Sequence, residues 1–338
     1  MATLNDVEIE EQIIRNPSRA TPDNAESRAL FVPSPDDPSW NAFEAIAIWI
    51  FSVLLILIVP TLFLLPYLAL QNPPITESSQ IVEFAKSDPT SILLQIIAIL
   101  PAHILTLLIA WLLVTRVRRY PFRQTLGWES GGFKWWHYIV ILVAFFAIAA
   151  VVSTFFPEKE NDLIRMLRSS RSVVYVVAFV ATFTAPVVEE VVYRGILYSA
   201  FQRTFKTPIR PLLGNNHFFQ RVKGLFVRIN LWTGIERLLF IVERIQMKYA
   251  IQFAILFVTL IFALVHVPQY YPSYSTIFLL TLLSLTLTAV RVKSGNLLPC
   301  IILHTLFNGV QSVLLIIEPY VTPAPSGEAP AAFLYFLK

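Results

Sequence analysis

The chain has 338 residues, of which 56% are hydrophobic and 14% are charged, and its formal net charge is +4. This composition is too apolar for a soluble globular domain and is typical of a polytopic membrane protein. A single cysteine excludes an intramolecular disulfide and a cysteine-based metal site. The small net charge gives no indication of a nucleic-acid partner, and we expect none.

Residues 1–40 differ from the rest of the chain because they are polar, acidic and rich in proline. A segment that cannot bury enough apolar surface stays unfolded, so we expect a disordered tail here. No basic stretch precedes an early apolar run, and a cleavable signal peptide is therefore not expected.

Apolar segments long enough to cross a bilayer follow the tail. A helix needs about 20 apolar residues to cross the hydrocarbon core of ~30 Å. The segments cover residues 43–70, 91–115, 135–156, 172–201, 250–267, 273–290 and 297–317. Because lipid offers the backbone no hydrogen-bond partner, each segment is expected to be helical. The predicted fold is all-α: a polytopic transmembrane bundle of seven or eight helices.

We expect three further parts after the tail. Residues 41–171 form the first transmembrane helices, residues 172–318 form a core that carries the chemistry, and residues 319–338 form a C-terminal tail. The core includes a basic insertion, residues 202–249, in which apolar and basic residues alternate in a partly helical rhythm. It is either an amphipathic helix on an anionic lipid surface or a cytoplasmic extension of the fifth span, and the two are compatible.

The orientation follows from the lysine and arginine residues, which gather after the second, fourth and sixth segments. If the spans alternate, these three regions share one side of the membrane, and the positive-inside rule makes that side cytoplasmic. The prediction is an integral multi-pass membrane protein with a cytoplasmic N-terminus and a C-terminus on the other side. We expect a bacterial inner membrane.

Two adjacent carboxylates lie inside the fourth segment, where charge is costly and indicates a function by default. Glu189 and Glu190 precede Arg194. On a helix, Glu190 and Arg194 are i, i+4 neighbours that can pair, whereas Glu189 points about 100° away from Glu190. An unpaired Glu189 would suit a general base. The alternative is a buried Glu190–Arg194 pair that only fixes helix packing, which leaves Glu189 without a role.

Two later segments each place a histidine one turn from another side chain. His266 follows Phe262 in the fifth segment, and Asn308 follows His304 in the seventh. The His304–Asn308 pair could donate hydrogen bonds to one oxyanion, or it could join neighbouring helices. His266 taken alone is a core histidine. His103, in the second segment, is expected to pack against a neighbouring helix.

Taken together, these motifs resemble those of the CPBP family, the CAAX prenyl endopeptidases and bacteriocin-processing enzymes. The matching residues are Glu189-Glu190-x-x-x-Arg194, Phe262-x-x-x-His266 and His304-x-x-x-Asn308. The resemblance implies a helical bundle that encloses a polar cavity open to the cytoplasmic side. It also implies an intramembrane endopeptidase that acts on a membrane-associated protein or peptide, which is of the prenylated CAAX type in the eukaryotic members. It implies that Glu189 and His266 activate water, that His304 and Asn308 form the oxyanion hole, and that Glu190, Arg194 and Phe262 support them.

A zinc ion is the alternative way of activating the water. Glu189, His266 and His304 could hold Zn²⁺ with an open position for water. No His-Glu-x-x-His motif is present, and the resemblance favours a reaction without a metal or other cofactor.

Two other functions remain open at this point. Carboxylates and histidines inside spans also form proton relays, so a proton-coupled transporter is possible, although such proteins typically show paired halves with interrupted helices. A non-catalytic membrane scaffold of the same fold is the second alternative. The partners that we expect are membrane lipids and a membrane-bound protein or peptide substrate, and the sequence gives no oligomeric state.

Overall fold

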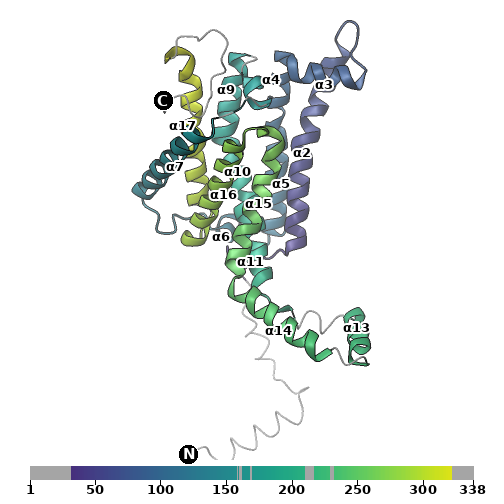
Figure 1. Cartoon of the computed structure of the whole chain (residues 1–338). Helices are drawn as coiled ribbons and strands as arrows, with labels where there is room; N and C mark the ends of the chain where they lie inside the picture. The colour runs from purple at the N-terminus through teal and green to yellow at the C-terminus, as the bar shows by residue number, and fades with distance from the viewer. Residues whose placement is uncertain are drawn as a thin grey trace, which may run out of the picture. The chain divides into compact units, whose positions relative to one another are not determined.

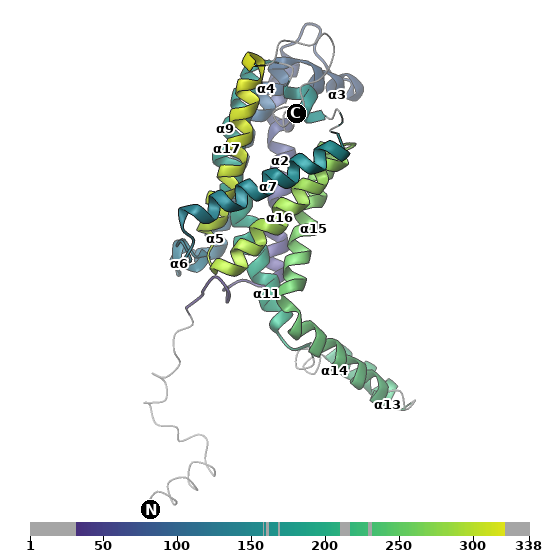
Figure 2. The same cartoon turned by 60° about the vertical axis from the view of Figure 1, so that its left-hand side comes forward.

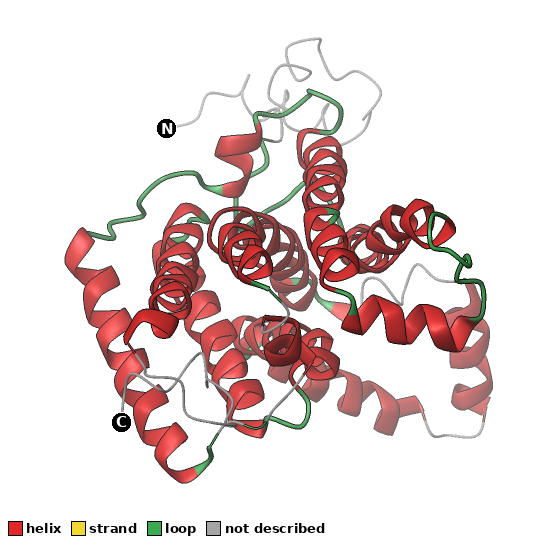
Figure 3. Ribbon diagram, turned by 90° about the horizontal axis from the view of Figure 1, so that it is seen from above, coloured by secondary structure: helices red, strands yellow, loops and turns green. Residues whose placement is uncertain are grey.

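The structure, a computed structural model, describes residues 32–157, 159, 162–167, 170–209, 217–228 and 232–321. Within these ranges the regular secondary structure is helical and no strand is present (Figure 3). The all-α fold predicted from the composition is therefore confirmed. Most of the predicted disordered tail and of the predicted C-terminal tail lies outside the described residues.

In the described part of the chain, seven helical stretches are long and apolar enough to cross a membrane, which confirms the predicted spans. They are α2 (Ala42–Ala69), α4 with α5 (Pro89–Ile97 and Ile99–Thr115), α7 (Trp135–Phe155), a continuous run from Arg171 to Lys206, α15 (Ala250–Tyr270), α16 (Tyr274–Ser294) and α17 (Leu298–Val321). Shorter helices join them: α3 (Ser78–Ser87), α6 (Phe122–Leu126), α8 (Asp162–Leu167), α13 (His217–Arg228) and α14 (Trp232–Lys248). The chain is thus an integral multi-pass membrane protein.

The first span begins at a capping box. Asn41 Oδ1 accepts a hydrogen bond from the backbone N–H of Glu44, and Glu44 Oε2 accepts one from the N–H of Asn41, both at 2.9 Å. This exchange satisfies two of the donors that a helix start leaves without partners. Arg116, which follows the second span, then binds both oxygens of Glu44 at 2.7 and 2.8 Å. This hydrogen-bonded carboxylate raises the pKa of the Arg116 guanidinium.

Because consecutive spans alternate in direction, the bundle has two distinct ends. The basic end carries α6, α11 (Tyr198–Lys206) and the starts of α2, α15 and α17. The distal end carries α3, α8, the start of the fourth span and the turn between α15 and α16. Figures 1 and 2 both show α6 and α11 at one end of the bundle and α3 at the other. Lysine and arginine residues between spans gather at the basic end, as expected from the sequence.

The basic end is closed by an ordered segment, residues 34–40, which lies within the predicted disordered tail. Trp40 is 1% exposed, and its Nε1 donates to the carbonyl of Ile196 at 3.0 Å. Arg291 donates to the carbonyl of Pro35, and Arg203 to that of Pro38. The prediction that disorder extends to residue 40 is therefore wrong for residues 34–40. A large aromatic ring and free carbonyls give this short segment enough apolar area and hydrogen bonding to fold onto the bundle.

In its described residues, the basic insertion contains the end of α11 and the helices α13 and α14. On α14, the apolar side chains of Leu238, Phe240, Ile241, Val242, Ile245 and Met247 are exposed. Gln246 ties α14 to the fourth span by donating to the carbonyls of Phe205 and Thr207. Only Tyr249 separates α14 from α15. The insertion is therefore both amphipathic and nearly continuous with the fifth span, so neither interpretation of this segment is excluded.

Candidate active site

The fourth span is not a uniform α-helix around the two carboxylates. It consists of α9 (Arg171–Phe179), the π-helix η3 (Val180–Thr184), α10 (Ala185–Glu190), the π-helix η4 (Val191–Leu197) and α11. In η3 the N–H of Ala185 donates to the carbonyl of Val180, five residues back. The next donor in that pattern would be residue 186, but Pro186 has no N–H, so the carbonyl of Ala181 lacks its helical partner. The carboxylates thus lie on a single α-helical turn between two wider turns.

Glu190 and Arg194 form the expected ion pair, and both side chains are fully buried. Arg194 Nη1 lies 2.9 Å from Glu190 Oε1. The other donors of the guanidinium reach α16, where Nη2 donates to the carbonyl of Ser284 at 3.0 Å and to its Oγ at 2.8 Å. Nε makes a longer contact of 3.4 Å with Thr288 Oγ1. Buried charges of this kind persist where pairing and hydrogen bonds replace water.

Phe262 connects this ion pair to His266. The Arg194 guanidinium lies 4.8 Å from the centre of the Phe262 ring, a cation–π distance. The Phe262 and His266 ring centres are 4.5 Å apart. The aromatic residue of the motif therefore packs between a buried cation and an imidazole, which holds both in place.

His304 lies between the two glutamates. Its Nδ1 is 2.8 Å from Glu190 Oε1, and its Nε2 is 3.9 Å from Glu189 Oε2. Glu190 Oε1 also accepts from Arg194, so this oxygen is shared by two donors if His304 Nδ1 carries a proton. Glu190 Oε2 is buried without a protein partner. The seventh span is thus joined to the ion pair of the fourth.

Glu189 has a different environment from its neighbour. Its side chain is 25% exposed, whereas that of Glu190 is 0% exposed. The rotation of about 100° per residue on an α-helix accounts for this difference. The Glu190 carboxylate is part of an ion-pair network, and the Glu189 carboxylate is partly exposed beside His304.

A contact with the backbone of Phe262 identifies which ring nitrogen of His266 carries the proton. Nδ1 lies 2.6 Å from the carbonyl oxygen of Phe262, which can only accept a hydrogen bond. Nδ1 must therefore carry the proton, and in the neutral ring Nε2 has a free lone pair. In the described part of the chain, no ion pair joins His266 to Glu189. His266 is partly buried.

Asn308 is held by the irregular backbone of the fourth span. Its Nδ2 donates to the carbonyl of Ala181 at 2.8 Å, the oxygen that Pro186 leaves without a donor. An amide nitrogen has two hydrogens, so one N–H of Asn308 remains available for another acceptor. The side chain is therefore oriented by one bond and free to make a second.

The contacts link six of the predicted site residues in an unbroken chain from Glu189 through His304, Glu190, Arg194 and Phe262 to His266. Asn308 lies one helical turn from His304. The sequence did not single out Ser284 and Thr288, because serine and threonine are common in transmembrane helices and carry no special spacing here. His103 hydrogen-bonds Thr184 of the fourth span at 2.9 Å, as expected for a packing histidine.

Metal-binding geometry is a separate question for the same residues. Among the side chains that the structure describes, no three His, Cys, Asp or Glu residues are placed to hold a metal ion together. His304 Nε2 already faces Glu189 Oε2 at 3.9 Å, so the zinc alternative would need His266 to bring its Nε2 to the same point.

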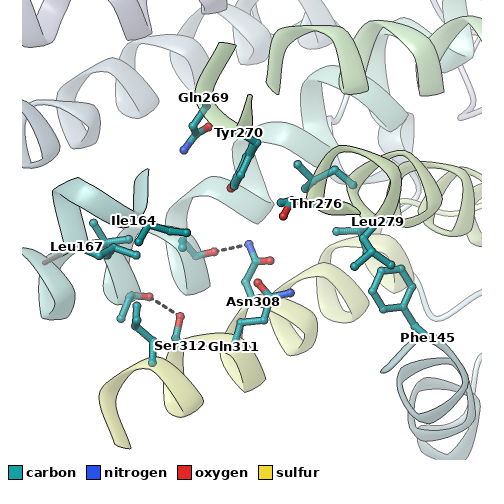
Figure 4. A pocket seen from close by; sticks show the side chains of 16 residues that line it. Phe145, Ile164, Leu167, Gln269, Tyr270, Thr276, Leu279, Asn308, Gln311 and Ser312 are labelled. Atoms are coloured by element: carbon teal, nitrogen blue, oxygen red, sulfur yellow. Dashed lines mark hydrogen bonds between the residues drawn. The ribbon is translucent and has the colours of Figure 1, made fainter. Parts of the chain in front are cut away.

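A pocket of about 230 Å³ opens beside the site (Figure 4). It reaches the site at Asn308 and extends along α17 past Gln311 and Ser312. Gln269, at the end of α15, and Ile164, on α8, line its far part. α8, the end of α15 and the later part of α17 lie toward the distal end of the bundle. The predicted cavity open to the cytoplasmic side is therefore not confirmed, because this pocket lies away from the basic end.

Seven membrane-length helices define a polytopic membrane protein, and a cluster of carboxylate, imidazole and amide groups lies between them. Residues 171–310 match the family model Rce1-like, described as type II CAAX prenyl endopeptidase. The match confirms the resemblance seen in the motifs: this part of the chain is similar to the type II CAAX prenyl endopeptidases. No curated protein and no solved structure matches the chain.

Proposed function

We propose that this protein is a glutamate-dependent intramembrane endopeptidase that hydrolyses a peptide bond of a membrane-bound protein or peptide. The observation that carries this proposal is the difference between two adjacent carboxylates. Glu190 is fully buried in an ion pair, whereas Glu189 is partly exposed next to His304. A structural role accounts for Glu190 and Arg194 but leaves a costly carboxylate at position 189 without a purpose.

In the proposed reaction, Glu189 and the free Nε2 of His266 accept hydrogen bonds from one water molecule. The water oxygen attacks the carbonyl carbon of the scissile bond while its proton passes to Glu189. Glu189 then returns this proton to the leaving nitrogen as the C–N bond breaks. The Glu189 carboxylate and Nε2 of the neutral His266 ring both accept hydrogen bonds. Both side chains are also partly exposed, so both can hold a water molecule.

Asn308 and His304 are proposed to stabilise the oxyanion. Asn308 has one N–H left after its bond to Ala181. His304 Nδ1 faces Glu190, so a donor role for Nε2 requires the doubly protonated ring. Donors that are already oriented before the reaction contribute most to this kind of catalysis.

The first test compares the protein termini generated in membranes that contain the wild type or Glu189→Gln. Because a general base contributes about 10²- to 10⁴-fold in rate, we expect cleavage to fall by at least about two orders of magnitude. Quantitative mass spectrometry of new termini measures it. Glu83→Gln, at an exposed position on α3, is the matched control and should leave cleavage unchanged. Retained cleavage in Glu189→Gln would refute the proposed role of Glu189, whereas termini that do not depend on the presence of the protein would favour a scaffold.

The second test addresses the metal. The proposed reaction uses only Glu189 and His266 on the water, so we expect cleavage by the purified protein to persist after dialysis against a strong chelator. Turnover measured before and after the treatment checks this. Loss of turnover that returns with Zn²⁺ would establish the zinc alternative through Glu189, His266 and His304.

A further inference from the structure

One face of α14 carries a stripe of exposed apolar side chains, although this helix precedes the fifth span and is not part of it. Leu238, Ile241, Val242 and Ile245 form the stripe, and each of them is between 44% and 60% exposed. At about 100° per residue, these positions and Tyr249 fall within a sector about 100° wide. Large apolar side chains gathered on one helix face indicate a surface that another body covers.

A different face of α14 already packs against the protein. Glu243 is 6% exposed, and Ile235 and Leu239 are partly buried on the same side. Gln246, also on this side, donates to two carbonyls at the end of α11. Trp232 lies under the ammonium group of Lys223 on α13, 5.1 Å from its ring centre. The apolar stripe is thus left free while a neighbouring face holds α14 to the rest of the chain.

The stripe of α14 continues into the exposed side of α15. The N–H of Tyr249 bonds the carbonyl of Ile245, and the N–H of Phe253 bonds the carbonyl of Tyr249. Both bonds have the α-helical i to i−4 spacing, so the helical phase is kept across the junction. Exposed apolar residues of α15 extend the stripe at intervals of three or four: Phe253, Leu256, Leu260 and Leu264. Because α15 is a membrane-length helix, this side faces lipid.

The length of α15 places α14 beyond the hydrocarbon core. The 21 residues of α15 span about 31 Å, which is enough to cross a core of ~30 Å without any help from α14. Tyr249, with φ −112° and ψ 22°, departs from helical dihedral angles and gives the chain a place to bend. Figures 1 and 2 show α14 running obliquely away from the bundle. A bend toward the lipid side turns the stripe of α14 onto the membrane surface.

Basic side chains line one edge of the stripe. Arg237, Arg244 and Lys248 are exposed and recur at i, i+7 and i+11, next to Ile241 on the helix surface. The exposed acidic residue of α14, Glu236, lies on the opposite side. Arginine and lysine can lay their carbon chains along apolar surface while their charges reach the headgroups. An apolar stripe with a cationic edge is complementary to an anionic lipid surface.

We propose that α14 docks in the plane of the membrane, with its apolar stripe below the headgroups and Arg237, Arg244 and Lys248 on anionic lipids. The continuity with the lipid-facing side of α15 favours lipid over a second copy of this chain, because one bilayer then covers both parts of the stripe. The contact does not depend on peptidase activity. It fixes the ends of the fourth and fifth spans, which Gln246 and Tyr249 join to α14.

Spin labels on the two sides of α14 test this docking. The full-length protein is placed in wide lipid nanodiscs of phosphatidylcholine and phosphatidylglycerol, and Cys300, which is fully buried, leaves little background. Ile241→Cys and Ile245→Cys report on the stripe, and Thr233→Cys and Met247→Cys are matched controls on the opposite side. We expect the stripe labels to collide with oxygen, which concentrates in lipid. The control labels should collide with a water-soluble nickel complex.

Two results would overturn the docking. Stripe labels that collide with the nickel complex as often as the controls would show that the stripe remains in water. Stripe labels shielded from both oxygen and nickel, with broadening from a second spin nearby, would show that another copy of the chain covers the stripe.

Substitution of the cations tests the preference for anionic lipid. In Arg237→Gln/Arg244→Gln, with the label at Ile245→Cys, two charges are lost. Each cation near an anionic surface adds about fivefold to membrane binding, so the ratio of lipid-facing to aqueous label should fall about 25-fold. Arg237→Lys/Arg244→Lys keeps both charges and should keep the original ratio. Nanodiscs of phosphatidylcholine alone should lower the ratio of the unsubstituted helix. A ratio that depends on neither the charges nor the lipid would overturn the anionic preference.

Discussion

At the scale of single residues, two adjacent glutamates of the candidate site differ in their burial and in their contacts. Glu190 Oε1 is within 2.9 Å of both Arg194 Nη1 and His304 Nδ1, whereas Glu189 Oε2 approaches His304 Nε2 only at 3.9 Å. The Glu190 carboxylate therefore joins the fourth span to α17, and the Glu189 carboxylate remains available. Substitutions at the two positions should separate stability from activity.

We expect Glu190→Gln to destabilise the protein and Glu189→Gln to leave its stability nearly unchanged. Removing one partner of a buried ion pair costs about 3–5 kcal/mol because the other charge stays buried without compensation. Thermal unfolding in detergent measures the difference between the two variants. The double variant Glu190→Gln/Arg194→Met removes the stranded cation and should recover part of the loss. Equal unfolding temperatures for the two single variants would contradict this account.

At the scale of elements, the fourth span departs from a regular α-helix on both sides of the two carboxylates. Pro186 removes the donor that the π-helical turn would supply to the carbonyl of Ala181, and Asn308 supplies it from α17. This exchange orients Asn308 and couples the seventh span to the fourth. The same amide therefore has a structural bond and, in the proposed reaction, a catalytic one.

A second substitution, which restores the backbone N–H that Pro186 lacks, can separate these two roles of Asn308. Asn308→Ala should lower both stability, by about 1 kcal/mol for the lost hydrogen bond, and cleavage. Adding Pro186→Ala provides an N–H for the carbonyl of Ala181, so the double variant should recover unfolding temperature but not cleavage. Thermal unfolding and turnover on the same preparations check this. Recovery of both would show that Asn308 acts only through the backbone of η3.

At the scale of the whole bundle, the two ends differ in how tightly they are packed. The basic end is a packed core closed by residues 34–40, and the distal end carries the pocket. The proposed site lies between them, with its buried ion pair toward the closed end and Glu189 toward the open one. The packed end holds the ion pair in place, and the pocket leaves space beside Asn308.

The closing segment should contribute measurably to the stability of the bundle. Trp40→Ala removes a fully buried ring and its bond to Ile196, and we expect a loss of about 3–5 kcal/mol. Trp40→Phe keeps most of the apolar area and loses the hydrogen bond, so its loss should be about 1 kcal/mol. Unfolding temperatures in detergent give the order of the three proteins. An unchanged temperature for Trp40→Ala would show that residues 34–40 do not hold the basic end closed.

The sequence alone determined the seven spans, because hydropathy over 20 residues is a local property that lipid enforces. It also determined the Glu190–Arg194 pair, since i, i+4 neighbours on a helix meet whatever surrounds them. The spacing of the three motifs was sufficient to indicate the protease family, which the match over residues 171–310 confirms.

Only the tertiary structure decided how these parts meet. The contacts of Arg194 with Ser284, of His304 with Glu190 and of Trp40 with Ile196 join residues 90 or more positions apart. No local pattern encodes such distances, because they depend on the tilt and rotation of each helix against its neighbours. The folded segment 34–40 and the position of the pocket at the distal end follow from that packing, so the charge pattern, which predicts an orientation for the spans, could not indicate the side of the pocket.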